Sequence, residues 1–534
     1  MEKNAIILAA GRSTRFAPFT YEKPKGLFIV RGEVLIERQI NQLIEAGVKD
    51  IYLVLGYMKE KFFYLEQKYD EVHLIVNNTY GKYGNLYSLY VARQHLKNTF
   101  ICCSDHYFID NPFIDDNEFN QSYRDCIYLN GNFREFSVDY SDDDIITGCY
   151  VGGRDKMAMM GHAYFNEGFS KRFVRYLEDE LDNFGVTGMY WEEFYATHIK
   201  DLTLHLREFR QNDIQEFDDI DDLRQFDSDF LLNVDSQIIG NICDTIHCHP
   251  NEITDIDVIQ AGLTNVSFKF TVKGTEYVYR HPGGTADHLI DRPTELYVQY
   301  QAKKIGIDKS VIKMHPSGWK ISYFVQDIVE CDFLSNPEQL EIAMEYIHRT
   351  HSIPVSFEAK IFDDVEEGKK LMGIASHTKG DLFTEFADII AKIEKIDEYV
   401  KREQEKYGIE LVISHNDVYE PNYIATGDGD MYLIDWEYAG INDPLNDIAC
   451  ILIRYDYSEE TRENLLKAYF GRELTEDEHR HAMGQAVLCS FYWFCWGLYK
   501  GSVGDDDGFF FLPSYRYLVT HVDDVLKTYN NLEL

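Results

Sequence analysis

The sequence predicts two domains of different fold class, an α/β domain with a mostly parallel sheet followed by an α+β domain of two lobes. The chain has 534 residues, which is too long for a single hydrophobic core. Strand and helix patterns alternate up to about residue 110, whereas strand patterns after residue 240 precede a mainly helical region. We place the domains at 1–235 and 240–534, and the two lobes of the second at about 240–330 and 331–534.

The first domain begins with an apolar run at residues 4–10 that ends at Gly11, which is typical of a buried strand leading into a loop. Alternating strands and helices favour a largely parallel sheet. The patterns predict strands at 51–56, 73–77 and 99–105, helices at 33–46, 59–69 and 85–97, three short strands within 123–165, and a helix at 169–182.

The second domain is preceded by an acidic segment at 212–233, for which a solvated linker or an exposed helix face is the expectation. Strands follow in a hairpin within 253–280 and again at 320–330. After residue 336 helical patterns dominate, interrupted by two short apolar runs at 411–415 and 431–435. A small β lobe therefore precedes a larger helical lobe.

The composition is strongly acidic, with 91 Asp and Glu against 52 Lys and Arg and a formal net charge of −39. Such a field repels nucleic acid and anionic membranes and attracts Mg²⁺ and cationic metabolites. The alternative is that the charge only maintains solubility. We expect no nucleic-acid partner.

The sequence also predicts a cytoplasmic location without membrane insertion. The apolar run at 6–10 is too short for a signal peptide, and the uncharged run at 486–499 is too short to cross a bilayer. The ten cysteines form no dense disulfide pattern. The group Cys243, His247, Cys248 and His249 lacks a second ligand pair at zinc-finger spacing, so we interpret it as incidental.

The first candidate site is the loop after the first strand, LAAGRSTRFAP at 8–18, with KPKGL at 23–27. Small residues allow the backbone N–H groups of Ala10, Gly11 and Arg12 to approach phosphate oxygens. Arg15 and Lys25 are cations that can stabilise negative charge as it develops on a phosphate. The loop therefore predicts nucleotide binding and phosphate chemistry.

This loop resembles that of the nucleotidyltransferase superfamily, which makes NDP-sugars and CDP-alcohols and has a Rossmann-like fold. The resemblance implies CTP as co-substrate and a Mg²⁺ ion held by Asp105, at the end of strand 99–105, and by Asp218 of Glu-Phe-Asp. Asn78, Asn85 and Ser88 resemble the asparagine and serine segment of the phosphocholine cytidylyltransferase branch, which implies nucleotide contact.

A cationic head group would need aromatic faces or a carboxylate in the first domain. Tyr190, Trp191 and Glu192 supply both types just before a helix. An ordinary core aromatic cluster explains these residues equally well, and both alternatives stay open at this point.

The second candidate site has the spacing H-x-D-x-x-x-x-N followed by D, as His415, Asp417, Asn422 and Asp435. This spacing is typical of kinase-like phosphotransferases. Asp417 can accept a hydrogen bond from a substrate hydroxyl, while Asn422 and Asp435 can hold Mg²⁺ at the phosphates of ATP. The apolar runs on either side predict a loop carried by a hairpin.

The β lobe upstream supplies the remaining kinase parts. Gly262 and Asn265 lie in a loop that can cover phosphates. Arg280 ends a strand at the point where protein kinases carry a lysine, and Glu295 follows in a helical stretch as its ion-pair partner. Together with the motif at 415–435, these residues favour phosphate contact.

Residues 255–500 resemble the choline/ethanolamine kinase family, with Gly-Leu-Thr-Asn at 262–265, arginine in place of the kinase lysine, and Asp-Trp-Glu-Tyr at 435–438. The resemblance implies a protein-kinase-like fold, a substrate-pocket acid at Asp447, and pocket aromatics at Tyr457, Trp493 and Trp496. Aromatic faces near a carboxylate suit a quaternary ammonium, which has no N–H to donate. A plain aromatic core helix is the alternative for Trp493 and Trp496.

The combined hypothesis is a bifunctional enzyme. Its second domain phosphorylates choline with ATP, and its first joins phosphocholine to CMP from CTP and releases pyrophosphate, both with Mg²⁺. Three alternatives remain: ethanolamine as the substrate, 2-aminoethylphosphonate or a sugar phosphate for the transferase, or a first domain that only senses nucleotide. The sequence makes no prediction of oligomeric state.

Overall fold

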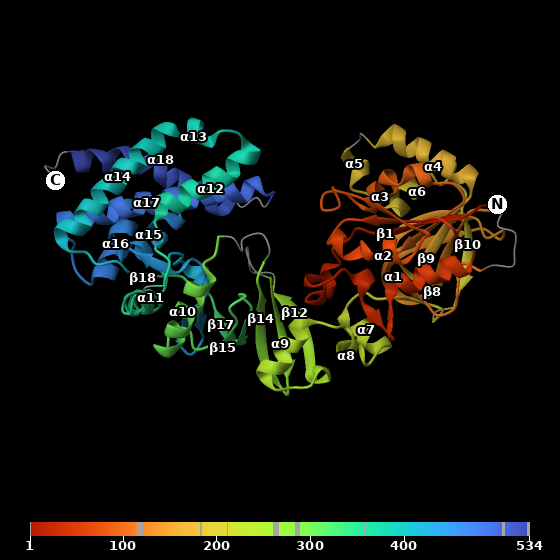
Figure 1. Ribbon diagram of the computed structural model, residues 1–534, viewed down its shortest axis with the longest axis horizontal. Coiled ribbons are helices and arrows are strands. Elements are labelled where there is room, and N and C mark those ends of the chain that lie inside the picture. Colours follow the sequence, from red (N-terminus) through yellow and green to blue (C-terminus); the bar gives the residue numbers. More distant parts are fainter. Residues whose placement is uncertain are drawn as a thin grey trace. The chain divides into compact units, whose positions relative to one another are not determined.

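The chain folds into two compact units in the computed structural model, which describes residues 2–114, 121–181, 184–210, 212–259, 266–283, 289–356, 358–504 and 508–530 (Figure 1). One unit contains the chain up to Val258 and Thr271–Lys273, and the other contains Ile259–Phe270 and the rest. The change from one unit to the other falls in strand β12 (Ile253–Ile259), further along the chain than the expected 235–240.

The first unit is built on a seven-stranded sheet in the order β10-β8-β9-β6-β1-β4-β5. Strands β6, β1, β4 and β5 are mutually parallel, which confirms the predicted α/β domain. The strands are β1 (Asn4–Ala9), β4 (Ile51–Leu55), β5 (Val72–Val76), β6 (Thr99–Cys103), β8 (Tyr123–Tyr140), β9 (Ile146–Phe165) and β10 (His205–Phe209).

Helices cover both faces of this sheet, so every residue of β1 is buried (Figure 1). Ala5 and Ile7 pack toward helix α1, and Ile6 and Leu8 pack toward α3, α4 and α6. The helices are α1 (Leu35–Glu45), α2 (Tyr64–Lys68), α3 (Asn85–Val91), α4 (Glu167–Glu180), α5 (Phe184–Thr187) and α6 (Trp191–Thr197).

The prediction of three short strands within 123–165 is wrong. The segment forms two long antiparallel strands, β8 and β9, with several register shifts between them. Gly131 and Gly152 have positive φ angles of 73° and Gly161 one of 93°, so the glycines accommodate irregular positions inside continuous strands. The same glycines resemble turn signals in the sequence.

The acidic segment 212–233 is an exposed helix face and not a linker. It forms β11 (Ile214–Glu216), α7 (Ile220–Phe226) and α8 (Phe230–Asn233). Ile220, Leu223 and Phe230 are buried, and most of the carboxylates stay at the surface, with Asp227 as a buried exception. Strand β11 pairs with β7 (His106–Phe108), and α9 (Gln237–Ile246) follows.

The β lobe of the second unit is a five-stranded sheet in the order β12-β13-β14-β16-β15. It confirms the hairpin within 253–280 and the strand near 320, and it adds β15, which the sequence patterns did not indicate. The lobe contains β13 (Val266–Val272), β14 (Thr275–His281), α10 (Arg292–Lys304), β15 (Val311–Met314) and β16 (Lys320–Tyr323). The next strand, β17 (Ile328–Val329), belongs to a separate three-stranded sheet.

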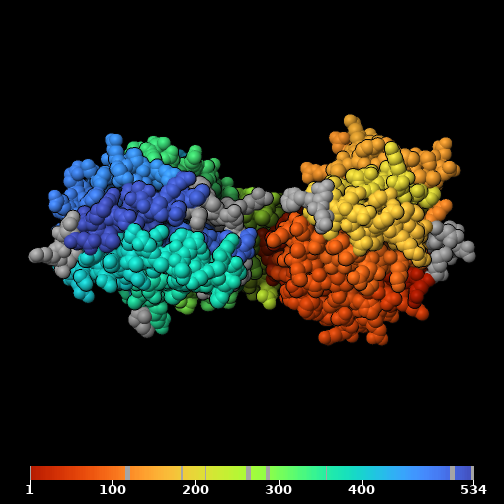
Figure 2. Space-filling model, turned by 90° about the horizontal axis from the view of Figure 1, so that it is seen from above, coloured from red at the N-terminus to blue at the C-terminus, as the bar shows by residue number. Residues whose placement is uncertain are grey.

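The helical lobe surrounds α17, a 27-residue helix that is buried along most of its length. Several helices begin at a side-chain cap, such as Asp363 before α12 and Thr475 before α17. Figure 2 shows α18 at the surface beside the segment that includes α14. The helices are α11 (Pro337–His351), α12 (Asp364–Lys379), α13 (Leu382–Glu385), α14 (Ala387–Tyr407), α15 (Leu445–Arg454), α16 (Glu459–Phe470), α17 (Glu476–Ser502) and α18 (Gly508–Asn530).

Two small sheets carry the loop 415–422 in this lobe, which confirms the predicted hairpin-borne loop. Strands β18 (Val412–Ser414) and β21 (Gly440–Asn442) pair, as do β19 (Tyr423–Thr426) and β20 (Met431–Leu433). Within the described ranges, no helix combines the length and the apolar character that crossing a bilayer requires.

Candidate active sites

The first cavity, of about 370 Å³, lies at the carboxyl edge of the parallel strands. Loops that follow β1, β5 and β6 contribute to its lining, because the carboxyl ends of parallel strands meet at one edge. The lining includes Ala10, Gly11, Lys25, Asn77, Asn85, Ser88, Cys103, Asp105 and Tyr190.

Lys25 and Asp105 form an ion pair in this cavity. Lys25 Nζ lies 3.0 Å from Asp105 Oδ2 and donates to the carbonyl oxygen of Phe217 at 2.5 Å. Burial alone would raise the pKa of Asp105, but Lys25 and His106 outweigh it and lower that pKa to about 2. The Asp105 carboxylate is therefore ionised and fixed in position, as a metal ligand must be.

Four predicted residues of this site lie elsewhere. Arg15 and Asp218, with side chains 70% and 54% exposed, pair with each other at 2.6 Å and do not line the cavity. Arg12 is exposed beside the ring of Tyr80. Asn78 is also exposed, and it is Asn77 that faces the cavity, where its amide donates to Ser88 Oγ at 3.1 Å. A one-residue shift along an extended chain reverses the direction of the side chain.

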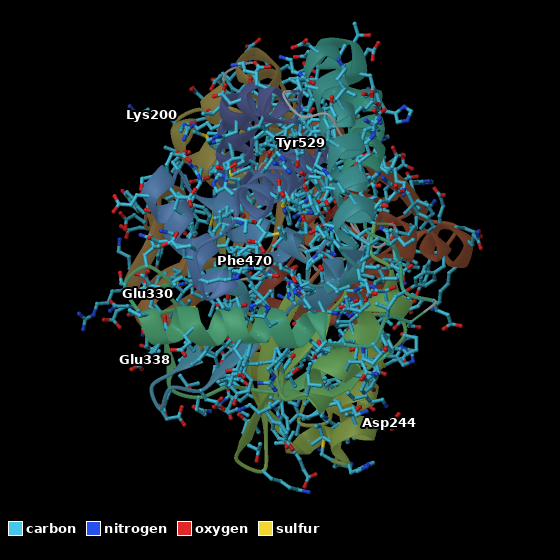
Figure 3. The ribbon with its side chains drawn as sticks, turned by 90° about the vertical axis from the view of Figure 1, so that its left-hand side faces the viewer. Lys200, Asp244, Glu330, Glu338, Phe470 and Tyr529 are labelled. Atoms are coloured by element: carbon cyan, nitrogen blue, oxygen red, sulfur yellow. The ribbon has the colours of Figure 1, made fainter. Side chains whose placement is uncertain are left out.

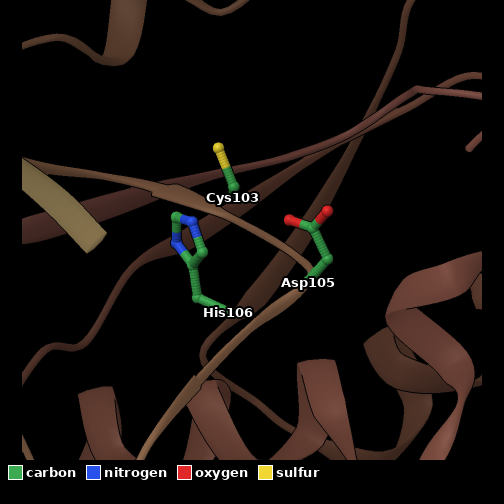
Figure 4. A group of neighbouring side chains, drawn as sticks. All are labelled: Cys103, Asp105 and His106. Atoms are coloured by element: carbon green, nitrogen blue, oxygen red, sulfur yellow. The ribbon is translucent and has the colours of Figure 1, made fainter. Parts of the chain in front are cut away.

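Asp105 instead has Cys103 and His106 as neighbours, with one ligand atom of each within 4.8 Å of the others (Figure 4). Glu216 pairs with His106 across β7 and β11, and its carboxylate lies 3.3 Å from His106 Nε2. Burial would raise the pKa of Glu216, but His106 outweighs it and lowers that pKa, so Glu216 is a second ionised carboxylate, beside Asp105, that has His106 as a neighbour. Their oxygens fit the hard ligands that Mg²⁺ prefers. Sequence reasoning missed Cys103 and His106, although they flank Asp105 in the chain.

The three residues expected to bind the head group in the first domain lie in different environments. Tyr190 is half exposed and lines the cavity. Trp191 is buried in the core against Phe165, so the core alternative holds for it. Glu192 is also buried outside the lining, 3.7 Å from Arg124, and burial raises its pKa to about 7.

The second cavity, of about 400 Å³, lies within the second unit and is lined by residues of both lobes. The predicted loop residues Gly262 and Asn265 lie outside the described residues. The lining includes Arg280, Lys320, Asp417, Asn422, Asp435, Glu437, Tyr438, Trp493 and Trp496.

Asp417 and Asn422 are joined within the loop 415–422. The Asn422 amide donates to Asp417 Oδ2 at 2.9 Å and to the Asp417 carbonyl oxygen at 2.8 Å. This leaves the amide oxygen of Asn422 as its ligand atom. With the carboxylate of Asp435, it fits the oxygen set that Mg²⁺ requires.

Arg280 forms the expected ion pair with Glu295. It also lies 3.1 Å from Asp435 and 3.7 Å from Glu437, and Arg292 joins the network at 2.7 Å from Glu295. Burial would raise the pKa of Glu295, but the two arginines outweigh it and lower that pKa. The network fixes the cation beside the Asp435 carboxylate.

Asp447 is not a pocket acid, so that prediction is wrong. It is fully buried and accepts the backbone N–H groups of His415 at 3.1 Å and Asn416 at 2.8 Å. His351 Nε2 lies 3.0 Å from the same carboxylate. Asp447 therefore fixes the loop 415–422 in position without lining the cavity. Tyr457 also lies outside the lining, and its hydroxyl donates to Glu420 at 3.4 Å.

Trp493 and Trp496 line the cavity as predicted, but a cation of the chain already contacts each ring, and Lys500 Nζ lies 5.5 Å from the ring centre of Trp496. The guanidinium of Arg454 lies 4.7 Å from the Trp493 ring centre and 4.1 Å from that of Tyr419. It also donates to Asp417 Oδ1 at 2.8 Å. Sequence reasoning missed Arg454, although a charged residue that ends the apolar run of α15 was a signal.

The two sites define two classes of transferase on one chain, a nucleotide-transferring α/β domain and a kinase-like domain. The family model described as "MobA-like NTP transferase domain" matches residues 5–132, and that described as "Choline/ethanolamine kinase" matches residues 256–471. The N-terminal part of the chain therefore belongs to the nucleotidyltransferases, and the C-terminal part is similar to the choline/ethanolamine kinases.

Individual relatives match one part each. The chain is 35% identical over 233 residues to a 2-aminoethylphosphonate cytidylyltransferase of Lancefieldella rimae, covering 43% of this chain and 93% of the relative. It is 32% identical over 223 residues to a choline-phosphate cytidylyltransferase of Streptococcus pneumoniae, covering 42% and 96%. The solved structure of choline kinase LicA from Streptococcus pneumoniae is 19% identical, with a TM-score of 0.45, covering 54% of this chain and 98% of that one.

Proposed function

We propose that this chain catalyses two consecutive reactions. The second domain transfers the γ-phosphoryl group of ATP to the hydroxyl of choline. The first domain then transfers CMP from CTP to phosphocholine and releases pyrophosphate. The observation that carries the proposal is the joined Asp417 and Asn422 beside Asp435 in one cavity, on the same chain as the Lys25–Asp105 pair in the other.

In the kinase step, Asp417 accepts the hydrogen bond of the substrate hydroxyl and orients its oxygen toward the γ-phosphate. Asn422 and Asp435 would hold Mg²⁺, which supplies neutralisation of phosphate charge. Arg280 lies within reach of Asp435 and contributes a fixed positive charge at the phosphates. The mechanism requires positioning and electrostatics, and no covalent enzyme intermediate.

In the transferase step, the backbone at Ala10 and Gly11 provides N–H groups for the phosphates of CTP. Lys25 would stabilise the charge that develops on the α-phosphate while phosphocholine attacks and pyrophosphate leaves. Asp105, with Glu216 as a further carboxylate, would hold Mg²⁺. Asn77, Asn85 and Ser88 face the same space and can contact the nucleotide.

Choline is the proposed head group because Trp493, Trp496 and Tyr438 line the kinase cavity. Ethanolamine is the second candidate. An aminophosphonate is a further candidate for the transferase, since one relative is a 2-aminoethylphosphonate cytidylyltransferase. The use of ATP and CTP favours a cytoplasmic location.

The test is product analysis after incubation of the purified chain with choline, ATP, CTP and Mg²⁺. We expect phosphocholine, CDP-choline and pyrophosphate by mass spectrometry and phosphorus NMR, and none of them in EDTA. Parallel reactions with ethanolamine and 2-aminoethylphosphonate decide the head group. Phosphocholine without CDP-choline, together with CTP binding in calorimetry, would contradict the transferase step and favour a nucleotide sensor.

A further inference from the structure

A cation that belongs to the chain itself contacts residues of the kinase cavity, although it does not line the cavity. The Arg454 side chain is 3% exposed, and its guanidinium packs against the rings of Tyr419 and Trp493. A guanidinium in this position uses one ring face of Trp493, the type of surface that would otherwise attract a cationic ligand. Trp496 donates its indole N–H to the Tyr438 hydroxyl at 3.0 Å, and Lys500 Nζ lies farther from its ring centre, at 5.5 Å, than Arg454 lies from that of Trp493.

The carboxylates of the cavity are also compensated. Three acidic residues line it among the described residues, and each has an arginine partner. Asp417 pairs with Arg454 at 2.8 Å, Asp435 pairs with Arg280 at 3.1 Å, and Glu437 lies between Arg280 at 3.7 Å and Arg292 at 3.5 Å. Asp447, the expected partner of an ammonium group, is sealed behind the loop. An incoming ammonium therefore meets no uncompensated carboxylate among these residues.

We propose that Arg454 is a specificity-determining residue of the kinase domain, which competes with cationic head groups for Trp493 and Asp417. It weakens the preference for a charged acceptor over an uncharged acceptor of the same shape. It is at the same time a positioning residue, because it holds the Asp417 carboxylate. The inference rests on the proposed phosphorylation of a small alcohol.

Choline and 3,3-dimethylbutan-1-ol test the inference, because they have the same shape and only choline is charged. The measured quantity is the ratio of KM for the neutral alcohol to KM for choline, with ATP saturating. In the unmodified chain we expect a ratio below about 3, since the resident guanidinium cancels most of the advantage of the charge. A ratio above about 10 in the unmodified chain would overturn the inference without any variant.

The variant Arg454→Gln removes the competing charge and keeps a polar side chain. We expect its ratio to rise about tenfold, mainly through a lower KM for choline. We also expect kcat to fall for both acceptors, because Asp417 loses a partner. Arg454→Lys retains the charge, so its ratio should stay near that of the unmodified chain. Arg462→Gln is the matched control. Arg462 is also buried, but its partners Glu459 and Leu452 do not line the cavity, whereas the Arg454 partners Asp417 and Trp493 do.

The outcomes distinguish the specificity role of Arg454 from its positioning role, and both from the proposed function. If Arg454→Gln lowers kcat but leaves the ratio unchanged, Arg454 only positions Asp417 and the specificity role is wrong. If Arg454→Gln does not fold, the ratios of the unmodified chain and of Arg454→Lys still decide the inference. If neither alcohol is phosphorylated by the unmodified chain, the proposed function itself is wrong and this inference falls with it.

Discussion

Lys25 is a buried cation whose partners come from two distant parts of the chain. Its ammonium group contacts the Asp105 carboxylate after β6 and the carbonyl oxygen of Phe217 after β11. It also lies 4.2 Å from the ring centre of Phe16. The position is therefore fixed by packing and hydrogen bonds, which is the preorganisation that stabilisation of a phosphoryl transition state requires.

At the residue scale, we predict that Lys25→Met lowers kcat of the transferase reaction by about 10²-fold or more. The pKa of Asp105 should rise from about 2, because burial would act with less opposing charge. The protonated carboxyl group is a poor metal ligand. The acid limb of the pH–activity profile should therefore lie at higher pH in this variant than in the unmodified chain. The measurement is kcat/KM for CDP-choline formation between pH 4 and 8.

Lys23→Met is the matched control for this experiment. Lys23 donates to the carbonyl oxygen of Val234 at 2.8 Å and does not line the cavity. The acid limb of the kcat/KM profile of this control should match that of the unmodified chain. An unshifted acid limb in Lys25→Met would show that Asp105 does not govern the reaction.

At the element scale, helix α15 holds the loop 415–422 through Asp447. Two backbone N–H groups of the loop point at one carboxylate, which fixes the start of the loop before Asp417. A negatively charged acceptor is well suited to this task, because it receives several donors at once. The residue acts through the loop and not through the substrate.

We predict that Asp447→Asn lowers kcat of the kinase reaction by about 10²-fold and destabilises its domain by about 1–3 kcal/mol, because an amide cannot accept all of these donors. Transferase activity should be unchanged. Steady-state kinetics separate this role from the original pocket-acid hypothesis, for which KM for choline alone would rise. Asp456→Asn, at an exposed pair with Arg516, should change neither quantity.

Helices α14, α17 and α18 are joined by a buried charge network. His481 of α17 lies 2.9 Å from Glu403 of α14 and 2.8 Å from Asp443. Tyr529 of α18, which is labelled in Figure 3, donates to the same Glu403. Burial would lower the pKa of His481, but hydrogen bonds with Asp443 and Glu403 outweigh it and raise the pKa to about 9. His481 is therefore positively charged at neutral pH.

The raised pKa makes the stability of the helical lobe depend on pH. A group with a higher pKa in the folded state contributes stability below its unfolded pKa of about 6.5 and loses it as pH rises through about 9. We predict that the free energy of unfolding of the kinase domain falls by about 3 kcal/mol between pH 7 and 10. Its thermal unfolding transition should move to lower temperature over the same range. Differential scanning calorimetry measures the shift.

His481→Gln should remove most of this pH dependence. His479→Gln, on the same helix at an exposed pair with Glu463, should keep it. The same slope in His481→Gln as in the unmodified chain would contradict the assignment of the titration to His481.

At the scale of the whole molecule, the two proposed sites lie in different compact units, and each has its own cavity and its own carboxylates. The product of the proposed kinase reaction is the substrate of the proposed transferase reaction. Because the two proposed active sites are on one chain, they are always present in equal amounts.

We predict that single substitutions separate the two reactions. Asp417→Ala should abolish phosphorylation of choline and still convert added phosphocholine to CDP-choline. Lys25→Met should accumulate phosphocholine, because Lys25 lines the transferase cavity whereas Arg15 does not. Mixing the two variants should restore CDP-choline from choline, because phosphocholine can diffuse between molecules. Loss of both reactions in either single variant would contradict the separation, and chromatography of the reaction mixtures measures all three compounds.

The sequence by itself determined the two fold classes and the residues that lie close together along the chain. Asp417 and Asn422 are joined because a five-residue spacing in one loop fixes their geometry, and the loop after β1 follows from a buried strand that ends at small residues. Periodicity and short spacings are local properties, so they can be recognised without the tertiary structure.

The tertiary structure alone decided which distant side chains meet and which way they point. Glu216 comes beside His106 only through the pairing of β7 and β11, Asp447 turns to the back of the loop, and Arg454 packs on Trp493. Close packing settles these positions, because a buried charge is stable only where the fold brings it a partner.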